Sequence, residues 1–266
     1  MAIVTISRGS YSKGKETAEK LAAKLAYECI GRRILIEASK DFNIPEIKLT
    51  RALHDAPSVL DRFTYGKERY ISFIRRRLIE SVQRDNVVYH GLAGHFFLKG
   101  IPHVLMVRII ANLEYRVKEE MQRENISYDK ARQILVKDDQ ERHKWALHLY
   151  GIDTNDPSLY DLVLHIDKLG VDDAVDIIAQ TVDRPCFQTT PESQAKLDNA
   201  LLWSKIQSYL SGPYPASKCV LKGGTAHISV KETPSKKDKI GAHIKELLKD
   251  EQEIEEVEIH IDPIVP

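Results

Sequence analysis

The first segment of the chain that could do chemistry is SRGSYSKGKET, residues 7–17. Gly9, Gly14 and Lys15 have the spacing Gly-x-x-x-x-Gly-Lys, which is typical of a loop that binds nucleotide phosphates. Glycines tolerate unusual backbone angles and let successive N–H groups face an anion, while the lysine reaches the phosphates. The predicted nucleotide-binding residues are Arg8, Gly9, Ser10, Tyr11, Ser12, Lys13, Gly14, Lys15, Glu16 and Thr17.

Glu16 stands where such loops usually carry the Ser or Thr that holds magnesium. A carboxylate beside phosphates repels them unless it reaches the metal or turns away from the site. Thr17 offers a hydroxyl one residue later. We therefore predict a Mg²⁺ site that uses Thr17 and Glu16.

A phosphate loop needs a strand that leads into it and a helix whose N-terminal dipole faces the anion. The apolar run Ala2–Ile6 predicts that strand, and apolar residues at 18, 21, 22 and 25 form one stripe of the helix. Further buried strands are predicted over 86–89, 103–110 and 160–166, with a short one around 27–30. Helices are predicted over 69–84, 113–124, 129–149 and 172–182. This alternation predicts an α/β fold with a doubly wound parallel sheet flanked by helices.

A change of pattern divides the chain after residue 182. The segment DRPCFQTTPES contains two prolines and loses the apolar periodicity, which is typical of a linker. Beyond it the pattern predicts helix 197–210, a hairpin of strands 218–221 and 226–230 around Gly223-Gly224, helix 237–248 and strand 257–261. We predict a first domain over 1–182, a linker over 183–196 and a small α+β (αββαβ) domain over 197–266. The element order of this domain resembles a BON-type module, which implies a docking or regulatory role with a protein or ligand partner.

Composition limits the classes of partner. The chain has 266 residues with 39 basic and 39 acidic side chains, so no overall charge favours nucleic acid or a membrane surface. The 3 cysteines lie far apart, which fits a reducing compartment, and we expect a soluble cytoplasmic protein. No window approaches the roughly 18–20 apolar residues of a membrane span. The pairs His90/His95 and His143/His148 do not align on one helix face, so no zinc cluster is predicted there.

The loop resembles that of the nucleoside-monophosphate kinases, and especially the cytidylate kinase-like family. In that family the loop ends in Gly-Lys-Gly-Thr, and here Gly14-Lys15-Glu16-Thr17 differs only at Glu16. Thr17 falls on the threonine of the family. Seen in this way, Glu16 replaces a glycine rather than a metal ligand.

The resemblance continues in NVVYHGLAGHFFLKGIPHVLMVRIIANLEYRV and covers about residues 1–182. Gly91 and Ala111 match a glycine and an alanine of the family, and Arg116 matches the arginine that opens its lid helix. Asp139 and Arg142 match the Asp-x-x-Arg of the lid, which implies a lid over about 112–150. In the family this pair helps to hold the nucleotide and its phosphates. Asp139 and Arg142 lie three residues apart on a predicted helix, and a surface ion pair is the alternative.

The region that would bind the phosphate acceptor departs from the family. The family sequence Asp-Gly-Arg-Asp becomes HGLA over residues 90–93, which leaves cytidylate specificity open. Arg32 and Arg33 follow the predicted strand around 27–30 and are candidates for holding the phosphate of the acceptor. The predicted substrate-binding residues are Arg33, Gly91, Asp139 and Arg142. The basic run over 75–77 points in several directions on a helix, so at most one or two of its arginines can face a pocket.

The resemblance implies phosphoryl transfer from ATP, with Mg²⁺, to a nucleoside monophosphate or a related small acceptor. Lys15, Arg116 and Arg142 would be the catalytic residues, because their charges neutralise the moving phosphoryl group. Two alternatives remain open. The first domain could be a non-catalytic nucleotide sensor that signals to the C-terminal module, or it could act on an acceptor that is not a nucleotide.

Overall fold

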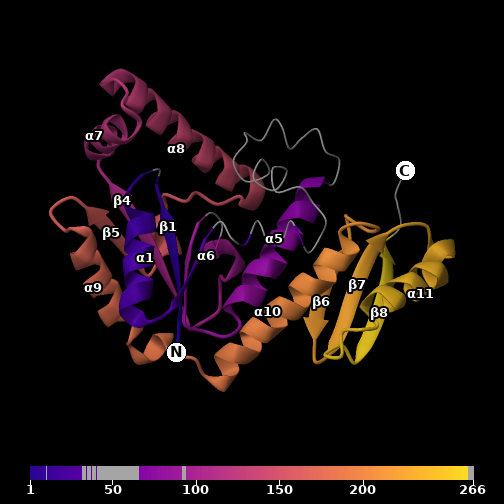
Figure 1. Ribbon diagram of the computed structural model, residues 1–266. Helices are drawn as coiled ribbons and strands as arrows, with labels where there is room; N and C mark the ends of the chain where they lie inside the picture. Colours follow the sequence, from indigo (N-terminus) through magenta and orange to yellow (C-terminus); the bar gives the residue numbers. More distant parts are fainter. Residues whose placement is uncertain are drawn as a thin grey trace.

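The computed structural model describes residues 1–9, 11–31, 34, 37, 40, 66–91 and 94–262. A parallel sheet with strand order β2-β3-β1-β4-β5 forms the centre of the N-terminal part (Figure 1). Its strands are β1 (Ile3–Arg8), β2 (Glu28–Ile30), β3 (Val87–His90), β4 (Val104–Ala111) and β5 (Leu162–Ile166). The predicted α/β class and every predicted strand of this sheet are confirmed.

Helices cover both faces of this sheet. They are α1 (Gly14–Leu25), α5 (Gly66–Val82), α6 (Gly94–Phe97), α9 (Val171–Val182) and α10 (Pro191–Leu210). The helices α7 (Leu113–Glu124) and α8 (Tyr128–Tyr150) lie beyond the carboxyl ends of the strands (Figure 1). The strand β1 reads as a continuous apolar run because it is buried on both sides. Val4 and Ile6 pack with α1 and α9, whereas Ile3 packs with α5, α6 and α10. Short 3₁₀ turns η1 (Pro157–Leu159) and η2 (Pro185–Phe187) complete this part of the chain.

A second, smaller sheet follows near the C-terminus. The strands β6 (Lys218–Lys222) and β7 (Thr225–Lys231) form an antiparallel hairpin, and β8 (Glu256–Asp262) pairs with β7 in parallel. Gly223 and Gly224 make the hairpin turn with φ of 52° and 80°, a backbone region that glycine enters without strain. The 3₁₀ turn η3 (Pro234–Lys236) and helix α11 (Lys237–Leu248) connect β7 to β8. The predicted order helix, hairpin, helix, strand is confirmed, while the BON-type resemblance stays a prediction.

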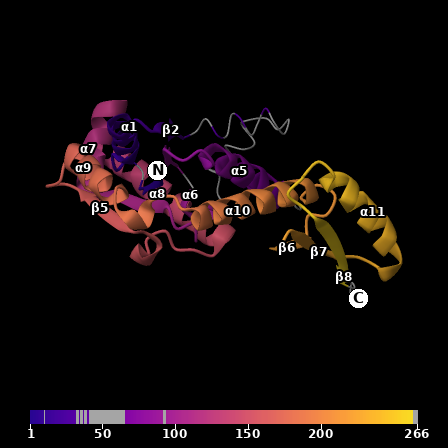
Figure 2. The same cartoon turned by 90° about the horizontal axis from the view of Figure 1, so that it is seen from below.

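Helix α10 packs with both parts of the chain (Figures 1 and 2). It begins at Pro191, rather than at 197, because Thr190 and Ser193 form a capping box. Leu197 packs in the core below the parallel sheet, whereas Ile206 and Leu210 pack in the core of the small sheet. The residues expected to form a linker therefore include the first turn of a helix that joins two cores.

The basic run over 75–77 also contacts α10. The guanidinium of Arg75 lies over the rings of Phe97 at 5.0 Å and Trp203 at 4.8 Å. Arg76 donates to Ser208 Oγ at 3.1 Å. These contacts hold α5 against α10, so Arg75 and Arg76 have a structural role and do not face the cavity at the carboxyl end of the parallel sheet. Among the described residues, no helix is long and apolar enough to cross a membrane.

Candidate active site

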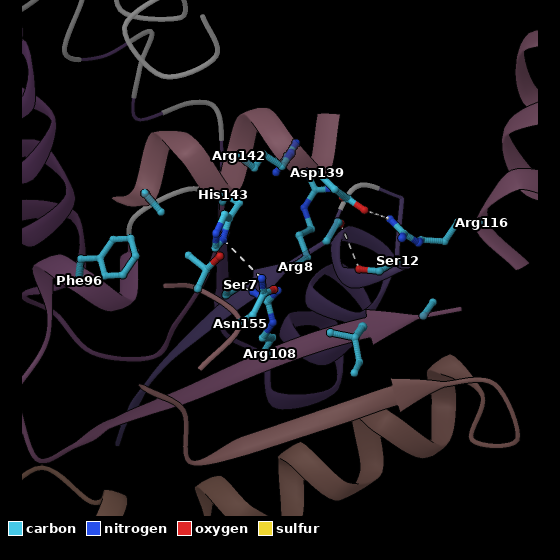
Figure 3. A pocket seen from close by; sticks show the side chains of 16 residues that line it. Ser7, Arg8, Ser12, Phe96, Arg108, Arg116, Asp139, Arg142, His143 and Asn155 are labelled. Atoms are coloured by element: carbon cyan, nitrogen blue, oxygen red, sulfur yellow. Dashed lines mark hydrogen bonds and ion pairs between the residues drawn. The ribbon is translucent and has the colours of Figure 1, made fainter. Parts of the chain in front are cut away.

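A cavity of about 330 Å³ lies at the carboxyl end of the parallel sheet, beneath α8 (Figure 3). Ligands of open α/β sheets bind at this edge, because the loops that follow the strands meet there. The segment after β1, strand β4, helices α7 and α8 and the loop before η1 all contribute to its wall. Its charged and polar lining residues are Ser7, Arg8, Ser12, Arg108, Arg116, Asp139, Arg142, His143, Thr154 and Asn155.

Arg8 and Arg142 face the cavity, and the one carboxylate that lines it among the described residues, Asp139, pairs with Arg116 instead. Burial lowers the pKa of Arg8, and the neighbouring charge of Arg142 lowers it further. In the part of the chain that the structure describes, neither guanidinium has a hydrogen bond or ion pair, and Nε of Arg8 is buried. Two like charges close together in a partly buried site are unfavourable unless an anion joins them. This pair is therefore suited to bind a phosphate group.

Arg116 and Asp139 meet across the two lid helices α7 and α8. Arg116 Nη1 donates to Asp139 Oδ2 at 2.7 Å, and the side chain of Arg116 is only 10% exposed. Asp139 therefore pairs with Arg116 and not with Arg142, although Arg142 lies on its own helix. Two of the three predicted catalytic residues, Arg116 and Arg142, thus line the same cavity as Asp139.

Arg108 is a cavity residue that the sequence did not single out. It lies on β4, where Nη2 donates to Asn155 Oδ1 at 2.9 Å and Nη1 lies 3.3 Å from the hydroxyl of Tyr160. Nη1 also lies 3.4 Å from Ser7 Oγ, because Ser7 and Arg108 are register partners in the sheet. An arginine inside the apolar run HVLMVRII was the available signal, because a buried charge is retained only with a partner or a function.

Of the two loop glycines, Gly14 acts by leaving space, whereas a Cβ at Gly9 would make only ordinary contacts, the nearest at 3.8 Å. The unusual backbone angles were expected at Gly9 and Gly14. Positive φ falls instead on Tyr11, at 54°, and on Lys13, at 65°. A Cβ added at Gly14 would lie 2.7 Å from Cβ of Arg8, closer than side chains approach. Gly14 therefore permits Arg8 to pack against the start of α1. Positive φ at two non-glycine residues costs on the order of 1 kcal/mol each, a strain that is common at binding loops.

The lysines of the loop line a second hollow of about 660 Å³, together with Arg8 and several glutamates. The side chain of Lys15 is 61% exposed and lies 3.6 Å from Glu19. Lys13 contacts Glu119 of α7, and this ion pair raises the pKa of Lys13. We call this second hollow the lysine hollow, and the cavity beneath α8 the arginine cavity. Arg8 lines both and so lies between them.

The two predicted metal ligands have different surroundings. The carboxylate of Glu16 lies 3.6 Å from Lys13 and 3.7 Å from Lys20, and it lines the lysine hollow. Thr17 is fully buried, and its hydroxyl donates to the carbonyl of Lys13 at 3.0 Å. Ser12, also fully buried, donates to the carbonyls of Gly9 and Ile109 and thereby ties the loop to β4.

The predicted acceptor region is described in part. Gly91 lines the arginine cavity with φ of 156°, and an added Cβ would lie 2.8 Å from the hydroxyl of Tyr89. His90 replaces the first acid of the family motif; burial lowers its pKa to about 4, and the charge of Arg8 acts in the same direction. It is therefore neutral at pH 7 and cannot supply the missing negative charge. Ser10 and Arg33 lie outside the described residues.

A family model described as the cytidylate kinase-like family matches residues 3–168, which include the loop, the parallel sheet and the lid helices. The chain belongs to the cytidylate kinase-like family. The family predicted from the sequence is thereby confirmed, while the roles of the individual loop and lid residues stay predictions.

Relatives named cytidylate kinase support this membership. The protein from Thermococcus sibiricus is 34% identical over 110 residues, 41% of this chain and 56% of its own length. The protein from Sulfolobus acidocaldarius is 27% identical over 181 residues, 67% of this chain and 93% of its own length. The chain thus spans little more than half of the length of the Thermococcus sibiricus protein. A solved structure of an uncharacterized protein from Eubacterium ventriosum is 21% identical, has a TM-score of 0.53, and covers 69% of this chain and 99% of its own.

Proposed function

We propose that the protein transfers a phosphoryl group from ATP to a nucleoside monophosphate or a related small phosphate-bearing acceptor. The observation that carries this proposal is the pair Arg8 and Arg142, two guanidinium groups that face one cavity without an anionic partner among the described residues. Membership of the cytidylate kinase-like family supports it. Arginine forms bidentate hydrogen bonds with phosphate oxygens, so this cavity fits phosphate better than a neutral ligand.

Phosphoryl transfer needs positioning and charge neutralisation rather than covalent chemistry from the protein. The N–H groups at the start of α1 have no preceding turn to bond with, so they can hold donor phosphates together with Lys15. Arg116 and Arg142 descend from the lid helices and would contact the phosphoryl group that moves. Arg8 lies between the loop and the cavity, where it would bridge the donor and acceptor phosphates.

The first turn of α1 has one group that fits Mg²⁺. Magnesium prefers oxygen ligands and usually keeps several waters while binding one or two carboxylates and the phosphates of the substrate. Glu16 fits this role, because its carboxylate is 45% exposed and lines the loop hollow. Thr17 fits less well, because its buried hydroxyl lines neither hollow and already donates to Lys13. Bound Mg²⁺ would neutralise phosphate charge and orient the donor.

The loop itself favours a second candidate, a nucleotide sensor without turnover. Lys13 and Lys15 both lie beside glutamates, at Glu119 and Glu19, so acids already compete for the cations that a donor phosphate needs. If these pairs persist in the presence of ATP, the lid arginines would bind an anion without catalysis.

An assay of phosphoryl transfer from ATP, with Mg²⁺, to a panel of nucleoside monophosphates separates the kinase from the nucleotide sensor. Arg142→Ala is expected to lower kcat/KM by about 10²-fold or more, because it removes a charge that stabilises the transition state. Arg132→Ala is the matched control, since Arg132 is an exposed arginine on the same helix. Lys15→Ala should weaken ATP binding as well.

The outcomes distinguish the candidates. ATP binding that depends on Lys15, without turnover on any acceptor, would exclude the kinase and support the nucleotide sensor. A chain that binds no ATP at all would exclude both functions. Turnover that is unchanged in Arg142→Ala would contradict the assignment of the cavity.

A further inference from the structure

Two histidines and a glutamate lie together on the C-terminal sheet, far in sequence from the kinase motifs. His227 is on β7, and Glu258 and His260 are on β8. His227 is the direct register partner of Glu258, and His260 follows two residues later. Residues two apart on a strand share a face, so all three side chains project from the same side of the sheet.

Their ligand atoms are close enough to share one metal ion. His227 Nδ1 lies 2.8 Å from Glu258 Oε2, and His260 Nε2 lies 3.7 Å from the same oxygen. One ligand atom from each of the three residues falls within 4.8 Å of the others. In a tetrahedral zinc site, bonds of about 2.0–2.1 Å place neighbouring ligand atoms roughly 3.3–3.4 Å apart. The two measured separations lie on either side of that value.

The surroundings leave this cluster accessible and its backbone fixed. Alternate residues of β7, including Ile228 and Val230, are buried against α10 and α11, so His227 faces away from that core. The three side chains remain 31%, 44% and 56% exposed in the order His227, Glu258 and His260. The two imidazole rings stack with centroids 6.2 Å apart. Small rotations of exposed side chains on paired strands can therefore close the site without moving the backbone.

We propose that His227, Glu258 and His260 bind a divalent transition-metal ion, zinc foremost. Two imidazoles and one carboxylate are the ligands of borderline metals such as Zn²⁺, whereas Mg²⁺ and Ca²⁺ select oxygen. Three protein ligands leave one position of a tetrahedral ion open to solvent. The site is chemically different from the magnesium site of the proposed kinase. It also lies at the opposite end of the molecule from α7 (Figures 1 and 2).

Calorimetric titration of the chelator-treated full chain with Zn²⁺ tests the proposal. We expect one zinc ion per chain, not displaced by an excess of Mg²⁺. Loss of a residue that only supports a ligand weakens metal binding about 10–100-fold, so His227→Ala and His260→Ala should each weaken zinc binding at least that much. Glu258→Gln keeps the shape of the side chain and removes its negative charge, so it tests whether the carboxylate is a zinc ligand. Co²⁺ in place of zinc adds a visible absorption that reports the imidazole ligands.

His165→Ala is the matched control, because His165 is an exposed histidine on a strand of the other sheet. It should bind zinc as the unmodified chain does. Circular dichroism of each variant establishes that the fold is retained. Zinc binding that is the same in the double variant His227→Ala/His260→Ala would overturn the proposal, and so would the absence of a stoichiometric zinc ion in the unmodified chain. Neither result bears on phosphoryl transfer, which uses other residues.

Discussion

Replacing Gly14 with alanine tests whether Arg8 depends on this glycine for its place between the two hollows. An added Cβ would lie 2.7 Å from Cβ of Arg8 and 2.9 Å from its Cδ. Cβ of Arg8 is fixed by the backbone of β1, where Arg8 is the register partner of Ile109 on β4, so a clash there cannot be relieved by rotating the end of a flexible side chain. Either α1 or the loop must move.

Two opposing effects set the magnitude. Alanine is favoured over glycine in a helix by up to about 1 kcal/mol, and by less at the first helical residue. Overpacking of a fixed contact costs about 1–3 kcal/mol. We therefore expect Gly14→Ala to lower the free energy of unfolding by about 1–2 kcal/mol. Turnover in the proposed phosphoryl transfer should fall as well, because Arg8 would be displaced from the wall of the cavity.

Gly241→Ala is the matched control for this change. Gly241 lies inside α11, and an added Cβ would meet Cγ1 of Ile259 at 3.7 Å, an ordinary contact. At Gly241 only the higher helix propensity of alanine acts, so the free energy of unfolding should rise by about 0.5–1 kcal/mol. Urea denaturation of both variants gives the two values. Equal stabilisation by Gly14→Ala and Gly241→Ala would refute the argument about Arg8.

Three further predictions concern other parts of the molecule. Burial lowers the pKa of His90 to about 4, so the unfolded chain binds a proton first, near pH 6.5. The free energy of unfolding should therefore fall as the pH drops from about 6.5 to about 4. His90→Gln should make this pH dependence weaker, as measured by urea denaturation at a series of pH values. Leu197→Ala removes a fully buried side chain of α10 and should destabilise the parallel-sheet core by about 2–5 kcal/mol, measured in the same way. Asp139→Asn removes the negative charge beside Arg116 at the cavity, so inorganic pyrophosphate should bind more tightly by about 1 kcal/mol, or roughly fivefold, by calorimetry.

Each of these has a contrary result. An equal fall of stability with pH in His90→Gln and in the unmodified chain would contradict the assignment to His90. A Leu197→Ala chain whose parallel-sheet part keeps its stability would show that α10 belongs only to the C-terminal unit. Weaker pyrophosphate binding by Asp139→Asn would show that Asp139 positions Arg116 for the anion.

Much of the fold could be predicted from the chain because its signals are local. The apolar runs became β1, β3, β4 and β5, and the helical stripes became α1, α5, α7, α8 and α9. Strand and helix periodicities depend on neighbours within a few residues, and burial of β1 on both faces left a continuous apolar run. The start of α10 was misplaced because Pro191 was taken as a linker residue, whereas proline at the first helical position favours a helix start together with the capping box of Thr190 and Ser193.

The site was predictable only where a motif marked it. The loop, Arg116, Asp139 and Arg142 were found through their resemblance to a family, and the structure brings the last three into one cavity. Arg108 escaped because its role depends on Asn155, which lies 47 residues away in the chain and beside it in space. The cluster of His227, Glu258 and His260 escaped for the same reason, since parallel strand pairing creates it.

The sequence by itself determined the elements, their order and the family, because these follow from short-range periodicity and from contiguous motifs. The tertiary structure decided which charges meet. It paired Asp139 with Arg116 instead of Arg142, and it placed Arg8 and Arg142 together without an anion among the described residues. The physical reason is that Coulomb and hydrogen-bond energies depend on distance in space, and sheet register and helix packing set that distance.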